Sequence, residues 1–465
     1  MSLPNLGRLI LCRRRLPSLV IVLLLILGAF SVIAWRGFAF VPGHTASSSF
    51  CAADLGSALD RQGHSEQVLW RGCLIASDTQ RALGRFVPPG NHAPACLGCH
   101  DGTTAPGFAL LWSRFPYRDA KGKIHDLAGA IREEIKRRYD GVPPNRADNV
   151  VTALYFYAAA KAGQAGLRYA VDTPQQPLFE QPDLASDDCR RKFDTLGWPR
   201  GDNAPAVVAG CNLVTETPRH VSAPIARAWG SRLSCQSCHL EAGDRVNAAS
   251  LAHGAVVLPH MLTSLTQPVR FDRRVLMCFA RSLNWLDFGL DAPEINPINI
   301  YANWLAQRHD LPIGVLPPGR GMPLVYDAQG RGVSFLAGEN VYRERCQACH
   351  GPNGLGGRVE VGGRRPPPLA GPESFTAAAT TSDPFRMAGF IHANMPPGAS
   401  LEQPQLSHQE ALDIAAYLTR LGRPADFTRA NALDVFFNYL WINGVTKIAV
   451  WLGDPDADSR RGGGR

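Results

Sequence analysis

The sequence predicts an all-α protein of three similar domains in tandem, preceded by one hydrophobic helix. The motif Cys-x-x-Cys-His occurs three times, at residues 96–100, 235–239 and 346–350. The first two motifs belong to an internal repeat, which indicates duplicated domains. Segments with apolar residues at three- and four-residue spacing follow the motifs, and this spacing is typical of helices.

Each Cys-x-x-Cys-His motif is the attachment signature of a c-type haem. The two thiols form thioether bonds to the haem, and the histidine binds one face of the iron. Three copies make zinc binding or redox cysteines a poor alternative, so we expect three covalently bound haem c groups in cytochrome c class I-like domains. The attachment residues are Cys96, Cys99, Cys235, Cys238, Cys346 and Cys349, and the iron ligands are His100, His239 and His350.

The N-terminus predicts export. Residues 1–15 carry four arginines, and residues 16–35 form an uncharged apolar run. Such a run is long enough to span a bilayer as a helix, and the arginines keep the preceding segment in the cytoplasm. A cleaved signal peptide is the alternative, because residues 32–34 resemble a cleavage site. We expect the protein on the periplasmic side of the bacterial inner membrane, held by this N-terminal anchor.

The other cysteines support an oxidising location. Cys12 precedes the apolar run, and four cysteines form two pairs with equal separation of 22 residues, Cys51–Cys73 and Cys189–Cys211. We expect both pairs to be disulfides, which stabilise exported domains. Cys278 is then left over, and an odd thiol in an exported protein is either reactive or a ligand.

The repeat defines the domain boundaries. In the first two domains the haem motif begins 23 or 24 residues after the second cysteine of the pair. Proline-rich stretches at 173–188 and 311–323 separate the domains. We expect haem domains at 51–172, 189–310 and 331–427. Residues 428–465 are expected to form an amphipathic helix and a tail, which lies either in the membrane interface or on a domain surface.

Apolar spacing predicts the helices. We expect helices at 127–139 and 150–159 in the first domain, and at 273–283 and 298–305 in the second. In the third domain a helix begins near Ser334, and Ser407 with Glu410 forms a capping box for a last helix at 407–421. Aligning the first two domains places Glu134 opposite Cys278.

A c-type haem needs a second axial ligand, whose identity sets its potential and reactivity. In the third domain we expect Met395, which lies 45 residues after His350 in a loop before the last helix. The first domain has no methionine, and none of its other candidates stands out: His92, Lys123, His125 and Lys136, with Glu134 at the position of Cys278.

In the second domain, Cys278 competes with other residues for the second axial position. The rivals are Met261, Met277, His253 and His260. Cys278 is favoured because it has no disulfide partner and lies near Arg273, Arg274 and Arg281, which would lower its pKa. A buried cysteine without a chemical role is an equal alternative on these grounds alone.

Longer segments of the second and third domains carry a resemblance. The second domain has Ser234-Cys235-Gln236-Ser237-Cys238-His239-Leu240, followed by Arg274-x-x-x-Cys278-Phe279-x-Arg281-Ser282. The third has Cys346–Gly351, Pro367–Leu369, Asn394–Pro396 and Arg423–Pro424. Over about residues 189–427 the chain resembles the cytochrome c-type thiosulfate dehydrogenases, with the first haem domain as an addition.

The resemblance implies a catalytic haem bound by His239 and Cys278, with Arg274 and Ser282 in the substrate pocket. Arg270 is a loose substitute for an arginine that the family carries further upstream, and Arg281 adds positive charge. The implied reaction joins two thiosulfate ions into tetrathionate through an adduct on Cys278. Its two electrons require the second and third haems together, and the first haem then serves as a relay to a soluble cytochrome or terminal oxidase.

Two alternatives remain at this level. One is a non-catalytic three-haem electron-transfer subunit of a membrane-bound dehydrogenase or respiratory complex, which needs no cysteine ligand. The other is a haem subunit of a multi-enzyme sulfur-oxidising complex. Nucleic acid is a poor partner, because the net charge of +8 is not gathered into a basic block with interleaved aromatic residues.

Overall fold

The computed structural model describes residues 49–56, 66–88, 90–103, 106–221, 233–262, 267–285, 289–319, 321–325, 332–357 and 365–424. The expected membrane segment at 16–35 and the segments 1–15 and 428–465 lie outside these ranges. Within them, no helix is both long and apolar enough to cross a membrane. The chain divides into two compact units, Met1–Asp54 and Leu55–Arg465, and the sites described below lie in the second.

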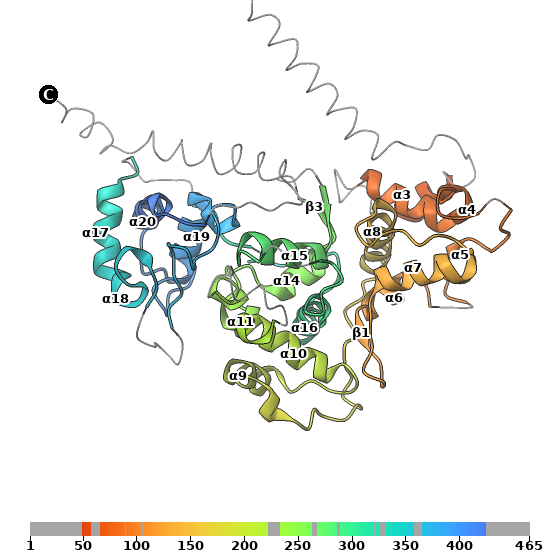
Figure 1. The fold of residues 1–465 in the computed structure, drawn as a ribbon, viewed down its shortest axis with the longest axis horizontal. Helices are drawn as coiled ribbons and strands as arrows, with labels where there is room; N and C mark the ends of the chain where they lie inside the picture. The colour runs from red at the N-terminus through yellow and green to blue at the C-terminus, as the bar shows by residue number, and fades with distance from the viewer. Residues whose placement is uncertain are drawn as a thin grey trace, which may run out of the picture. The chain divides into compact units, whose positions relative to one another are not determined.

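Helices are the main secondary structure in the described part of the second unit, and they form three groups that follow one another along the chain (Figure 1). The first group contains α3 (Glu66–Ser77), α4 (Thr79–Ala82), α5 (Cys96–Cys99), α6 (Phe108–Arg114), α7 (Leu127–Arg138) and α8 (Asn149–Gln164). The second contains α9 (Asp187–Leu196), α10 (Ala204–Thr215), α11 (Thr217–His220), α13 (Leu240–Gly243), α14 (Leu251–Val257), α15 (Phe271–Arg281) and α16 (Ile295–Arg308). The third contains α17 (Phe335–Arg345), α18 (Gln347–His350), α19 (Pro384–Asn394) and α20 (His408–Arg420).

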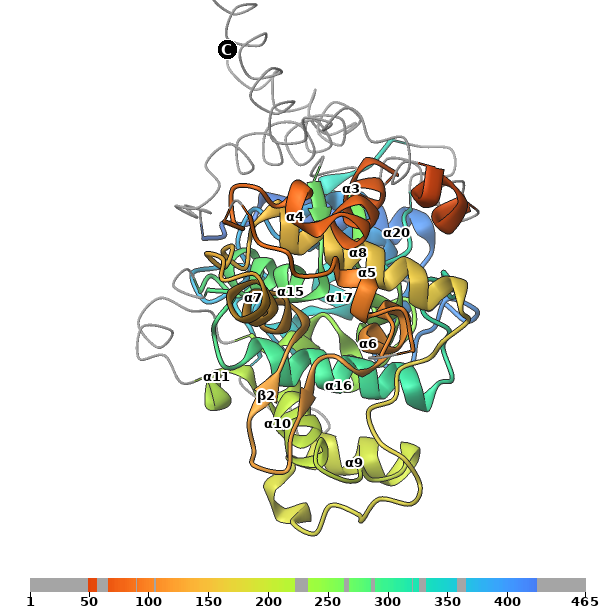
Figure 2. The same cartoon turned by 90° about the vertical axis from the view of Figure 1, so that its right-hand side faces the viewer.

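One helix pair recurs in all three groups: α3 with α8, α10 with α16, and α17 with α20. Figures 1 and 2 both show α3 beside α8. A glycine of the first helix lies against the backbone of the second at each crossing. A Cβ atom would lie 2.2 Å from the carbonyl oxygen of Ala153 at Gly72, 2.1 Å from that of Pro297 at Gly210, and 1.9 Å from that of Asp413 at Gly338. Glycine therefore sets how closely each pair approaches.

The predicted repeat between the first two groups extends to individual hydrogen bonds. Thr79 Oγ1 accepts the N–H of Cys96 at 2.8 Å, and Thr217 Oγ1 accepts the N–H of Cys235 at 3.0 Å. Each hydroxyl also donates to the carbonyl four residues before it, at 2.8 and 2.6 Å. An equivalent threonine hydroxyl thus fixes the start of the haem motif in each of the two groups.

The disulfide prediction is confirmed for Cys189 and Cys211, which are bonded to each other. Cys51 and Cys73 each take part in a disulfide. Among the described cysteines, Cys278 is the one that belongs neither to a disulfide nor to a haem motif.

The helix predictions are confirmed with small shifts at the ends. The expected helix at 127–139 is α7, and that at 273–283 is α15, which begins two residues earlier. Ser334 caps α17 by accepting the N–H of Ala337 at 3.1 Å. The predicted capping box is present, with Ser407 and Glu410 each bonded to the other's backbone N–H at the start of α20.

Two antiparallel hairpins depart from the all-α prediction. Strand β1 (Tyr117–Arg118) pairs with β2 (Ile124–His125), and β3 (His260–Leu262) pairs with β4 (Gln267–Val269). Strands of two or three residues are too short to show an alternating pattern in the sequence. The protein is therefore mostly, but not entirely, helical.

Hydrogen bonds join the second group to its neighbours. On one side the buried Asp172 carboxylate accepts from Trp304 Nε1 at 3.2 Å and Arg308 at 2.8 Å. On the other side Asn394 accepts from Arg245 Nε at 2.9 Å and donates to the carbonyl of Asn247 at 3.1 Å. Asn394 precedes the predicted iron ligand Met395, so this contact ties the third group's ligand loop to the second group.

We expect Gly338→Ala to destabilise the protein by about 1–3 kcal/mol, because its new methyl group would overlap the carbonyl of Asp413. That loss exceeds the gain of up to about 1 kcal/mol in helix propensity. The free energy of unfolding of the haem-loaded chain, from urea titration, measures the effect. Gly422→Ala is the matched control, since a methyl group there would meet nothing within 4 Å. Equal stability of both variants would contradict the close crossing.

Candidate active site

The three motif histidines share one orienting contact to the backbone. Nδ1 lies near a carbonyl oxygen in each: 3.0 Å for His100 and Pro106, 2.6 Å for His239 and Ala249, and 3.0 Å for His350 and Pro367. A carbonyl oxygen only accepts, so Nδ1 carries the hydrogen and Nε2 keeps its lone pair. This is the tautomer that an iron ligand requires, and the residues therefore fit a haem at each motif.

The second motif opens onto a cavity of about 360 Å³. Cys235, Cys238 and His239 line one wall. Helix α15 and its C-cap also line the cavity, with Arg274, Cys278, Arg281 and Ser282. The structure thus brings together the two attachment thiols, the proximal histidine and the odd cysteine.

Cys278 lies within hydrogen-bond reach of His239 and is half-buried. Burial raises the pKa of its thiol, but the charge of Arg274, the hydrogen bond with His239 and the charge of Arg281 together lower that pKa to about 7. Arg274 lies four residues before Cys278 and Arg281 three residues after it, so one helix face presents all three. The arrangement favours a thiolate opposite His239, as an iron ligand requires.

The rival ligands in the second group are less well placed. Met277 and His253 are not among the described residues that line the cavity, although Met277 is adjacent to Cys278 on α15. His253 is buried on α14, and burial lowers the pKa of its imidazole. The side chains of His260 and Met261 lie outside the described part of the structure.

Arg270 does not line the cavity among the described residues. Its side chain is 1% exposed and forms a two-point ion pair with Asp272, at 3.0 and 2.8 Å. It also donates to the carbonyl of Arg146 at 2.8 Å and lies 4.5 Å over the ring of Tyr155. Arg270 thus anchors the start of α15 to the first group, and the structure does not place it where it could bind substrate.

The third group contributes to the same cavity, which the sequence did not reveal. Thr380, Thr381 and Arg386 line it, and Arg274 donates to Thr380 Oγ1 at 3.3 Å. These residues lie more than a hundred positions from Cys278 and belong to no recognisable motif. No local pattern in the sequence could have identified them.

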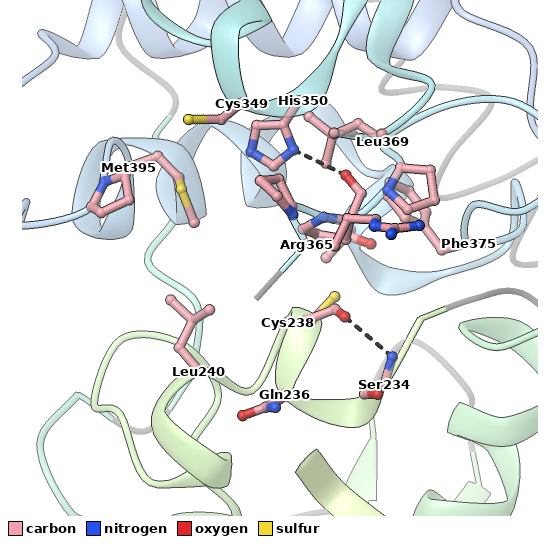
Figure 3. A pocket seen from close by; sticks show the side chains of 18 of the residues that line it. Ser234, Gln236, Cys238, Leu240, Cys349, His350, Arg365, Leu369, Phe375 and Met395 are labelled. Carbon is pink, nitrogen blue, oxygen red and sulfur yellow. Dashed lines mark hydrogen bonds between the residues drawn. The ribbon is translucent and has the colours of Figure 1, made fainter. Parts of the chain in front are cut away.

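The third motif has its own cavity, of about 750 Å³. His350 and Met395 both line it, and Figure 3 shows Cys238 of the second motif across it from Cys349. Burial lowers the pKa of His350 despite its hydrogen bond to Pro367, which keeps the imidazole neutral. The cavity therefore holds the predicted ligand pair and adjoins the second motif.

Comparisons with known proteins agree with these observations. A family model described as Cytochrome c matches residues 335–422. The thiosulfate dehydrogenase of Allochromatium vinosum is 33% identical over 231 residues, which is 49% of this chain and 81% of that protein. The thiosulfate dehydrogenase of Psychrobacter arcticus is 34% identical over 195 residues, which is 42% of this chain and 58% of that protein.

Among solved structures, the thiosulfate dehydrogenase (TsdBA) of Marichromatium purpuratum in its "as isolated" form matches 77% of this chain and 74% of its own, with a TM-score of 0.44 and 24% identity. Sequence identity carries the assignment, because the chain covers most of the length of the Allochromatium vinosum relative. The chain is an oxidoreductase with covalently bound haem c, and it belongs to the thiosulfate dehydrogenase family.

Proposed function

We propose that the chain oxidises two thiosulfate ions to tetrathionate in the cavity between His239 and Cys278. The placement of Cys278 beside His239, within a cavity lined by arginines, carries this proposal. The relatives described above are named for the same activity. His239 and Cys278 would hold the iron of the catalytic haem, which would accept the electrons.

The charge of the cavity suits this substrate. Thiosulfate is a dianion, so two of them repel each other strongly when they approach within a few ångströms. Arg274, Arg281 and Arg386 provide three guanidinium groups on the cavity wall. Asp383 also lines it, but its carboxylate accepts the N–H groups of Phe385 and Arg386 at 3.0 and 2.9 Å as the N-cap of α19. Guanidinium groups donate paired hydrogen bonds to oxyanions, which positions both substrates.

Cys278 supplies the covalent step. Its thiolate and one thiosulfate form a Cys–S–S–SO₃⁻ adduct and release two electrons. A second thiosulfate attacks the sulfane sulfur of the adduct, as in thiol–disulfide exchange, and tetrathionate leaves while the thiolate is regenerated. The haems would supply the one-electron acceptors for the two electrons. Ser282 lies at the C-cap of α15 and lines the same cavity. In this proposal its hydroxyl donates a hydrogen bond to the bound substrate.

We further propose three haems and a periplasmic, membrane-anchored location. The shared histidine contact and the repeated glycine crossing support a haem in each helical group. The cavity that Cys238 and Cys349 both line would bring the second and third haems close together. The first haem would pass electrons toward a soluble cytochrome or a terminal oxidase. A non-catalytic carrier would need neither the odd thiol nor the three arginines around it.

Cys278→Ala tests the covalent step. We expect haem reduction by thiosulfate to slow by at least about two orders of magnitude, because the variant cannot form the adduct. Stopped-flow absorbance of the reduced haem bands measures the rate. The haem content should stay unchanged, and dithionite should still reduce every haem, which is the control. Unchanged turnover with thiosulfate would contradict the proposal.

Arg274 and Arg270 should separate substrate binding from stability. We expect Arg274→Gln to raise KM for thiosulfate about tenfold or more, with a stability change of only about 0.5 kcal/mol, because its guanidinium faces the cavity. Arg270→Met should instead lower the free energy of unfolding by about 3–5 kcal/mol, because it leaves Asp272 buried without its partner. Steady-state kinetics and urea titration of both variants measure this. The reverse pattern would show that Arg270 is the substrate-binding residue.

A further inference from the structure

The residues expected at the second axial position, called here the distal side, differ between the first and second haem motifs. The helices around the two motifs are nevertheless arranged alike. The helices α7 and α15 follow the first and second motifs, with Asp126 and Arg270 as their N-caps. Glu134 lies eight residues after Asp126, and Cys278 lies eight residues after Arg270. Glu134 on α7 therefore occupies the position that corresponds to Cys278 on α15.

Electrostatic contacts support this equivalence. Burial is the main cause of the raised pKa of Cys96, and the charge of Glu134 adds to it. Burial is likewise the main cause of the raised pKa of Cys235, and Cys278 adds to it. Each of these two residues thus acts electrostatically on the first thiol of its own motif.

Arg138 completes the distal side of the first motif. Its Nε donates a hydrogen bond to the Glu134 carboxylate at 2.7 Å. Its Nη1 lies 3.6 Å from Cys99 Sγ. This sulfur would become a thioether sulfur on haem attachment. The side chains of Glu134 and Arg138 are 41% and 52% exposed. The distal side is therefore polar and open to solvent.

The other candidate ligands of the first group are placed elsewhere. His125 Nε2 lies 2.8 Å from Asp119 Oδ2, and its ring stacks on Tyr117 within the β1–β2 hairpin. His92, Lys123 and Lys136 are exposed. Lys136 lies two residues after Glu134, which turns it about 200° around the helix from Glu134. Thr79 Oγ1 lies 3.1 Å from Cys96 Sγ, and Tyr139 also neighbours this thiol. In the described part of the first group, Glu134 and Arg138 are the ion pair beside the motif thiols.

A carboxylate held by an arginine is a weak partner for haem iron compared with a thiolate or thioether. The polarity, hydrogen-bond donors and access of a distal pocket decide whether a haem binds exogenous ligands or only transfers electrons. We propose that the haem at Cys96–His100, which is part of the proposed three-haem function, has an exchangeable sixth position that binds small anions. Arg138 would donate hydrogen bonds to the bound anion.

Titration of the oxidised, intact protein with potassium cyanide tests this, with electron paramagnetic resonance as the readout. We expect three haems per chain by pyridine haemochrome assay, one of them high-spin. One equivalent of cyanide should convert that haem to low-spin, while the other two stay unchanged. Three haems that are all low-spin before cyanide would overturn the inference but keep the three-haem count. Two haems would overturn both.

Glu134→Cys tests the residue assignment. A thiolate at this position should make the first haem low-spin and weaken its cyanide binding at least tenfold. Glu133→Cys is the matched control, because Glu133 is the exposed neighbour on α7 and should leave the high-spin signal unchanged. Arg138→Leu should weaken cyanide binding about tenfold while the haem stays high-spin. A high-spin signal that persists in Glu134→Cys, or one that also disappears in Glu133→Cys, would overturn the placement of Glu134.

Discussion

The site depends on one constraint, which is the position of α15. This helix must hold Cys278 against His239, and contacts at both of its ends fix it. At the N-terminal end, the buried Arg270–Asp272 pair reaches the carbonyl of Arg146 in the first group. At the C-terminal end, Thr376 of the third group donates to the carbonyl of Arg281 through its backbone N–H, at 3.3 Å, and through its hydroxyl. The thiol is therefore positioned by all three helical groups.

We propose that one recurring scaffold presents a different residue to the second face of the iron in each group. In each group a glycine crossing joins two helices (α3 with α8, α10 with α16, α17 with α20), and a backbone carbonyl orients the motif histidine. The residue proposed to face the iron from the other side then differs from group to group: Glu134, Cys278 or Met395. Because the histidine side is constant, the distal residue decides what chemistry each group can support. The cysteine beside two arginines is suited to a sulfur anion, and the methionine to electron transfer.

Local patterns in the sequence predicted much of this architecture. Helix spacing and the Ser407–Glu410 capping box depend on neighbouring residues, so the sequence displays them directly. Cys278 could also be identified from the sequence, because the other described cysteines belong to haem motifs or to disulfides. Positive charge alone could not separate Arg270 from Arg274, because the difference lies in which tertiary partner each side chain meets. Arg386 was missed because only the packing of the third group on the second brings it to the cavity.

The central claim is that Cys278 and His239 face the same iron. Near-infrared absorption of the oxidised, intact protein tests it most directly, because thiolate-ligated low-spin haem has a distinctive charge-transfer band there. We expect such a band in the unmodified chain, with the intensity of one haem, and its loss in Cys278→Ala with the haem content unchanged. A band that is absent from the unmodified protein, or that persists in Cys278→Ala, would contradict the account.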